Sequence, residues 1–150
     1  MKKFNFTLQS LLDIRLRKED EIKLMLAKKI NQIQQSFAIQ NEIHDKLRDL
    51  QETEKKRRKE TENVSLLKAS VAYRFKLKAD LIEIVRKIDT LKNEADNIRA
   101  KLTEATKQRR AIEILKENKF SEWKKEQNDL EQKFIDDISQ QSFIRKTRQL

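Results

Sequence analysis

The chain has 150 residues, of which 40% are charged and 6% aromatic, and it carries a formal net charge of +10. It contains no glycine, proline or cysteine, which excludes glycine-rich phosphate loops, folds that need several tight turns, disulfides and cysteine-based metal sites. Good helix formers dominate, so the composition predicts an all-α protein with close to one turn. The charge favours an acidic partner: nucleic acid, an anionic membrane face or a negatively charged protein surface.

The first residues show no targeting signal. Two lysines near the start are not followed by an apolar run of signal-peptide length, and no later window is apolar enough to span a membrane. We therefore expect a cytoplasmic protein.

The first helix is predicted over about residues 7–58. With Thr7 as the N-cap, Phe6 and Leu11 take the positions of a hydrophobic staple. An apolar stripe at helical spacing follows. Its members are Ile22, Leu26, Ile30, Ile33, Phe37, Ile43, Leu47 and Leu50.

The turn is predicted within residues 59–66, centred near residue 62. The run Lys55–Lys59 is five consecutive cations, which suit the negative end of a helix dipole, and Asn63 tolerates the left-handed conformation. An uninterrupted helix is the structural alternative. The run also resembles the basic region of a DNA-binding zipper or a nuclear-localisation patch, but it lacks the Asn and Ala residues that read bases, so a helix terminus is favoured.

The second helix is predicted over about residues 66–145. Its narrow apolar stripe indicates a coiled-coil seam, with a frame skip of three residues near Ile88. The stripe consists of Leu81, Val85, Ile88, Leu91, Ala95, Ile98, Leu102, Ala105 and Ile112. We expect two long helices in an antiparallel coiled-coil hairpin, forming a single domain over residues 1–150.

The second helix should extend past the first as a C-terminal overhang. In the predicted register, residue i faces roughly residue 124 minus i, which brings Phe4 and Phe6 towards Phe120 and Trp123 and leaves residues 124–150 without a partner helix. An unpaired apolar stripe is an oligomer seam, a partner site or a frayed tail, and we favour a partner site. The stripe consists of Leu130, Phe134, Ile138, Phe143 and Ile144.

No residue pattern indicates catalysis. His44 is the only histidine and cannot build a metal site alone, and the paired carboxylates lie on predicted helices without a cavity to shift their pKa values. We expect no enzymatic activity and no catalytic, cofactor-binding or metal-binding residues.

Both ends of the sequence resemble the flagellar FliJ family. The N-terminal motif is Phe4-x-Phe6-x-Leu8-x-x-Leu11-Leu12-x-x-Arg15-x-x-x-Glu19. The C-terminal one is Glu126-Gln127, then Phe134-Ile135-Asp136-Asp137-Ile138 and Phe143. Residues 135–139 resemble the family's C-terminal "LDEIA" segment and depart from it at Ile135, Asp137 and Ser139.

The resemblance implies a two-helix antiparallel coiled coil, similar to the rotor stalk of rotary ATPases, that acts in flagellar type III export and flagellum biogenesis. It implies binding to the hexameric export ATPase of the FliI type, a link to the export gate protein of the FlhA type, and a chaperone-escort role with export chaperones as further partners. The expected place is peripheral, at the cytoplasmic face of the inner membrane, with membrane contact only through the apparatus, no nucleic acid and no cofactor.

We expect two binding surfaces from this resemblance. The end facing the ATPase ring would carry Phe4, Phe6, Leu8, Leu11, Arg15, Trp123, Lys125, Phe134 and Phe143. The surface facing the gate would carry Gln40, Ile43, Leu47, Leu50, Tyr73, Phe75, Leu77 and Ile82.

Each surface has a simpler interpretation. Phe4, Phe6 and Trp123 would only close the end of the hairpin. Tyr73, Phe75 and Leu77, which fall outside a single narrow seam, would only fill an irregular stretch of it. The alternative functions are a basic coiled-coil dimer that binds nucleic acid, a self-associating tether, and a stalk protein of a virulence-type secretion system.

Overall fold

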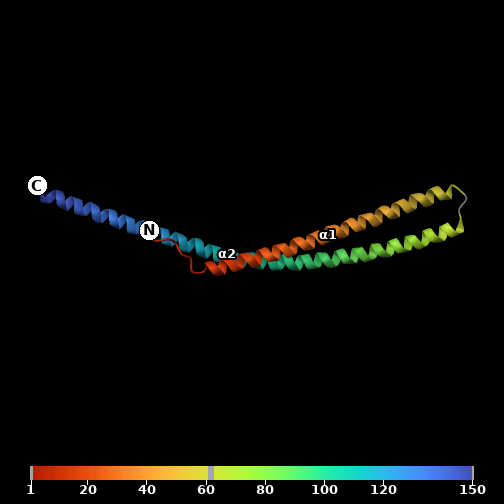
Figure 1. Cartoon of the computed structure of the whole chain (residues 1–150), viewed down its shortest axis with the longest axis horizontal. Coiled ribbons are helices and arrows are strands. Elements are labelled where there is room, and N and C mark those ends of the chain that lie inside the picture. Colours follow the sequence, from red (N-terminus) through yellow and green to blue (C-terminus); the bar gives the residue numbers. More distant parts are fainter. Residues whose placement is uncertain (1, 61–62, 150) are drawn as a thin grey trace. The chain divides into compact units, whose positions relative to one another are not determined.

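The computed structural model describes residues 2–60 and 63–149 and contains two helices, α1 (Gln9–Arg58) and α2 (Val64–Arg148) (Figure 1). These residues contain no β-strand, and the two helices pack against each other. The predicted all-α fold of two long antiparallel helices, with the second one longer, is confirmed.

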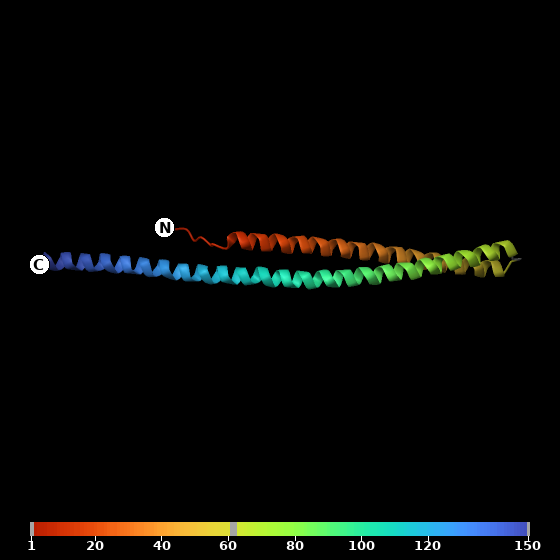
Figure 2. The same ribbon diagram turned by 90° about the horizontal axis from the view of Figure 1, so that it is seen from below.

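The contacts divide the chain into two units. Unit 1 comprises Met1–Glu19 and Glu104–Leu150, and unit 2 comprises Asp20–Thr103. In each unit α1 and α2 lie side by side and run in opposite directions (Figures 1 and 2). The predicted single domain over residues 1–150 stays a prediction.

Contacts between the helices agree with the predicted register in both units. In unit 1 the Lys116 Nζ donates to the Gln9 Oε1 at 2.8 Å. In unit 2 Lys29 forms an ion pair with Glu94, and the Arg57 Nη1 donates to the Ser70 Oγ at 3.0 Å. In each pair the two residue numbers add up to nearly 124, as expected for a turn near residue 62.

The start of α1 differs from the predicted cap. The Gln9 N–H donates to the Phe6 carbonyl at 3.1 Å, and the Leu12 N–H donates to the Leu8 carbonyl at 3.0 Å. Because the N-cap carbonyl accepts the first bond of the helix, Leu8 is the N-cap. The prediction of Thr7 at that position is wrong by one residue, and a tight turn precedes the helix.

The cationic run forms the end of α1, as predicted. Its last turn contains Lys55, Lys56, Arg57 and Arg58, where positive charge offsets the negative end of the helix dipole. Because α1 ends here, the alternative of one uninterrupted helix is wrong. Residues 61 and 62, on which the centre of the predicted turn falls, lie outside the described residues.

Asn63 starts the second helix. Its Oδ1 accepts from the Ser65 N–H at 3.0 Å, and its carbonyl accepts from the Leu67 N–H at 3.0 Å. These are the bonds of an N-cap. Asn63 caps α2 without adopting the left-handed conformation that asparagine tolerates, since no described residue has a positive φ.

The core of unit 2 is a regular seam without the predicted frame skip. Ile84 is 7% exposed whereas Val85 is 46% exposed, so the seam of α2 steps evenly by four and three. The prediction of a skip is wrong because Ile84, and not the adjacent Val85, occupies the seam position. Ile43, Leu77, Ile84 and Ile88 form the buried cluster, with Leu47, Leu50 and Leu81 packed against it.

On α1 the seam lies one residue away from the predicted stripe over part of its length. Ser36 is 2% exposed, while Phe37 beside it is 38% exposed and Ile30 is also exposed. The Lys92 Nζ lies 5.1 Å from the centroid of the Phe37 ring, a cation–π contact at the edge of the seam. The buried positions of α1 therefore include small and polar residues.

Candidate interaction surfaces

The aromatic cap of unit 1, formed by Phe4, Phe120 and Trp123, closes the pairing of the two helices. The Phe4 and Phe120 rings meet edge to face with centroids 5.2 Å apart, and the Trp123 ring lies 5.9 Å from Phe4 and 5.8 Å from Phe120. Such pairs add to the stability that burial supplies. The expected approach of Phe4 to Phe120 and Trp123 is confirmed, and Phe6 is buried.

The other N-terminal residues expected to face the ATPase ring differ in exposure. Leu8 is exposed, whereas Leu11 and Arg15 are half-buried, and Arg15 donates to the Gln108 Oε1. Much of the N-terminal set therefore holds unit 1 together, as the simpler interpretation has it.

A chain of ion pairs lies beside this pairing in unit 1. The buried Glu19 accepts from the Arg109 Nε and, at 3.3 Å, from the Thr106 Oγ1. Arg109 also reaches Glu113 at 2.6 Å, and Arg110 reaches Glu113 at 3.2 Å. Hydrogen bonds to Glu113 and then to Glu19 raise the pKa of Arg109, and hydrogen bonds to Glu113 and then to Glu117 raise the pKa of Arg110. They keep the two arginines charged.

Glu113 should make the stability of the chain depend on pH. The hydrogen bond from Arg109, followed by the one from Arg110, lowers the pKa of Glu113 below its ordinary value of 4.5. The folded state therefore holds this proton less tightly than the unfolded state, so the pairs stabilise above that value and lose their effect as the pH falls through the folded pKa.

We expect Glu113→Gln to be less stable than the natural chain near neutral pH and to approach it in stability in acid. Urea unfolding of both proteins across that range measures the difference. A stability difference that stays constant with pH would contradict this assignment.

The overhang of α2 in unit 1 carries exposed apolar side chains. Phe134 is 66% and Phe143 is 68% exposed, and Leu130, Ile135, Ile138 and Ile144 are exposed as well. Lys125 and Lys133 are also exposed. The overhang is helical to Arg148, so helix geometry sets where each of these side chains is attached around the axis.

The residues expected to face the gate separate into two groups in unit 2. Ile43 and Leu77 are buried in the core cluster, with Leu47 and Leu50 packed against it and Gln40 half-buried. The prediction that Leu77 falls outside the seam is wrong.

Tyr73, Phe75 and Ile82 are exposed. Phe75 and Ile82 are seven residues apart and share one flank of α2, whereas Tyr73 lies on the opposite flank, because two residues turn a helix by about 200°. The exposed members of the set therefore do not form one surface.

Two kinds of site, a metal-binding group and a membrane-spanning helix, are absent from the described residues. No group of three or more histidine, cysteine or acidic residues could hold a metal ion. No described helix has the length and apolar character needed to cross a bilayer.

Comparison with known protein families gives a match over residues 4–148 to the family described as flagellar FliJ protein. A search of curated proteins and a search of solved structures each gave no match. The matched family is a non-catalytic component of the flagellar export apparatus. Because the match spans nearly the whole chain, this protein belongs to the flagellar FliJ protein family and takes part in flagellar export.

Proposed function

We propose that this chain binds the hexameric export ATPase through the overhang of unit 1 and the export gate protein through a flank of unit 2. The observation that carries the proposal is the overhang, a helical segment whose large apolar side chains are exposed. Exposed apolar surface of this extent is typical of a partner site.

The placement of these side chains around the helix favours an enclosing partner. Leu130, Phe134 and Ile138 follow one another every four residues and share one side of α2. Ile135 and Phe143 fall about 100° or more from Phe134 at 100° per residue. A partner helix in a coiled coil would cover one side only, whereas the lumen of a ring surrounds the segment. The exposed Lys124, Lys125 and Lys133 would steer it towards acidic ring surfaces.

Replacing Phe134 and Phe143 together with alanine tests the ATPase contact. We expect at least about tenfold weaker capture of the hexameric export ATPase, because each aromatic side chain would be an anchor of the interface. Helicity, measured by circular dichroism, should not change, since neither ring packs within unit 1. Deleting residues 130–150 should abolish capture. Undiminished capture by both variants would refute the contact.

The gate contact is supported by the flank of unit 2 that carries Phe75, 70% exposed, and Ile82, 57% exposed. Gln40 lies beside a hollow of about 210 Å³ that Phe37 and Val85 also line. The buried Ile43 and Leu77 would support this surface from inside, without touching the partner.

Phe75→Ala with Ile82→Ala should weaken capture of the export gate protein by at least about tenfold. The two double variants serve as controls for each other, because each removes two exposed apolar side chains from one surface. We expect the overhang variant to keep gate binding and the flank variant to keep ATPase binding. Loss of both activities in either variant would contradict separate surfaces.

The chaperone-escort role rests on membership of the family alone. Export chaperones would therefore be tested as a third ligand of the same two variants. Retention of chaperone binding by both would assign it to a different surface.

A further inference from the structure

The end of unit 2 next to the turn carries a concentration of positive charge. We define the basic end as residues 51–60, which comprise the last residues of α1 and the two that follow it, together with residues 63–78 of the region where α2 begins. Its cations are Lys55, Lys56, Arg57, Arg58, Lys59, Lys68, Arg74, Lys76 and Lys78, and its acidic side chains are Glu52, Glu54 and Glu60. Cations outnumber carboxylates here, so the basic end attracts an anionic partner.

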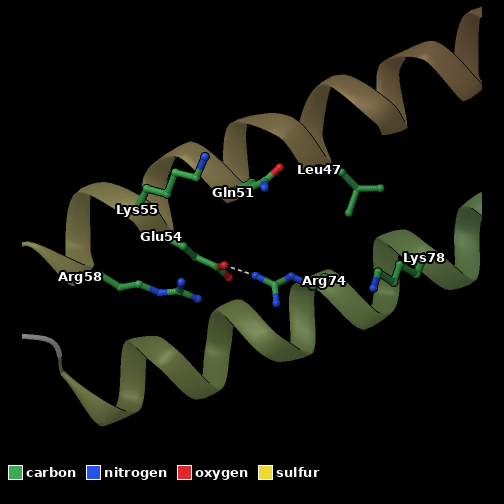
Figure 3. Close-up of a pocket in the computed structure, with 7 residues that line it drawn as sticks. All are labelled: Leu47, Gln51, Glu54, Lys55, Arg58, Arg74 and Lys78. Carbon is green, nitrogen blue, oxygen red and sulfur yellow. Dashed lines mark hydrogen bonds and ion pairs between the residues drawn. The ribbon is translucent and has the colours of Figure 1, made fainter.

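Four of these cations surround a hollow between α1 and α2. The hollow has a volume of about 400 Å³ and is lined by Leu47, Gln51, Glu54, Lys55, Arg58, Arg74 and Lys78 (Figure 3). The buried Glu54 pairs with Arg74, which leaves its Oε1 without a partner. Among the described residues Lys55, Arg58 and Lys78 form no ion pair. The hollow therefore offers unpaired cationic donors for an anion.

Exposed apolar side chains lie on the first two turns of α2, beside these cations. Val64 is 65% exposed, and Leu66, Leu67 and Val71 are exposed as well. Val64, Leu67 and Val71 share one side of the helix, whereas Leu66 lies about 200° from Val64. Apolar groups thus surround the start of α2 and do not form a stripe along it.

We propose that the basic end of unit 2 docks directly on an anionic lipid bilayer. Lipid phosphates would occupy the cationic hollow, and Val64, Leu66 and Leu67 would enter the headgroup region. Basic and apolar side chains together are what interfacial membrane anchors use. An acidic protein surface would also attract the cations, but it would not favour apolar groups on opposite sides of one helix end. The family resemblance implies membrane contact only through the export apparatus, so a direct contact with the bilayer departs from that expectation.

Sedimentation of the full chain with phosphatidylcholine vesicles, with and without phosphatidylglycerol, tests the proposal. The natural chain should bind only the anionic vesicles and dissociate as salt is raised. A variant with Lys55, Lys56, Lys68 and Lys76 changed to glutamine should bind at least about tenfold more weakly. The matched control changes the exposed Lys28, Lys87, Lys101 and Lys107 to glutamine and should stay within about twofold of the natural chain, because these lysines lie outside the basic end.

Insertion is tested separately from charge. Leu66→Ser with Leu67→Ser should weaken binding to anionic vesicles, while Leu24→Ser with Met25→Ser, an exposed adjacent pair elsewhere on unit 2, should not. Trp123 is the only tryptophan, so Leu67→Trp in a Trp123→Phe background reports on the basic end. Its fluorescence should shift to shorter wavelength with anionic vesicles only.

The proposal is overturned if the natural chain does not bind the vesicles, if both charge variants lose binding equally, or if the fluorescence of the tryptophan reporter does not shift. One further result would overturn it: the natural chain binds polyglutamate better than the vesicles, and the variant with Leu66→Ser and Leu67→Ser binds polyglutamate as well as the natural chain does.

Discussion

Replacing Leu77 with alanine is expected to lower the free energy of unfolding by about 2–5 kcal/mol. Leu77 is 4% exposed and belongs to the cluster with Ile43, Ile84 and Ile88. A two-helix seam has few side chains from elsewhere that could move into the space, so the cavity should persist and add to the lost burial. Urea unfolding followed by circular dichroism measures the change.

Leu24→Ala is the control for Leu77→Ala. It removes the same atoms from a side chain of unit 2 that is exposed, so we expect a change below about 1 kcal/mol. If the two variants were equally stable, Leu77 could not lie in the seam. The packing assigned to unit 2 would then be incorrect.

Replacing Glu19 with alanine is expected to destabilise the chain by about 3 kcal/mol. Glu19 is buried and accepts from both Arg109 and Thr106. Its removal leaves the Arg109 Nε without this acceptor in a partly buried position. Because Arg109 keeps Glu113 as a partner, we place the effect at the lower end of the range for a broken buried pair.

A second variant separates the cost of an unpaired charge from the loss of volume. Glu19→Leu combined with Arg109→Met replaces both charges with apolar side chains of similar length, and we expect it to regain most of the lost stability or to exceed the natural chain. Thermal unfolding of the natural, single and double variants makes this comparison. A double variant as unstable as Glu19→Ala would show that the ion pair itself supplies the stability.

The helices and their register could be predicted because both follow from the spacing of the apolar residues and from the absence of glycine and proline. Without glycine or proline, only the stretch after Lys55–Lys59 had the cations and capping residues of a helix boundary. Placing the turn there sets the register, and with it the contact of Phe4 with Phe120.

The detail of the seam could not be predicted from apolar spacing. Ile84 and Val85 are adjacent and equally apolar, so the pattern alone could not choose between them. On α1 the seam includes Glu19, Ser36 and Glu54, all buried. Glu19 and Glu54 are buried because arginines of α2 pair with them, and no hydropathy pattern contains that information.

The sequence distinguished only some residues of the candidate surfaces from residues of the core. A stripe that runs past the end of its partner helix, such as the one with Phe134 and Ile138, is visible from the register alone. Near the turn, however, seam and surface residues alternate closely, so the expected gate set combined the buried Leu77 with the exposed Phe75. The heptad position, which the structure supplies, distinguishes the two.

The most direct test of this account is the distance between spin labels on cysteines introduced at Leu8 and Lys119, since the chain has no cysteine of its own. Both positions lie in unit 1, where Gln9 contacts Lys116, and paired helix axes are about 8–10 Å apart. We predict a label separation below about 30 Å, allowing for the label arms and helix spacing. A separation of more than about 100 Å, as in an unbroken helix rising 1.5 Å per residue, would contradict the antiparallel pairing from which both proposed binding surfaces are derived.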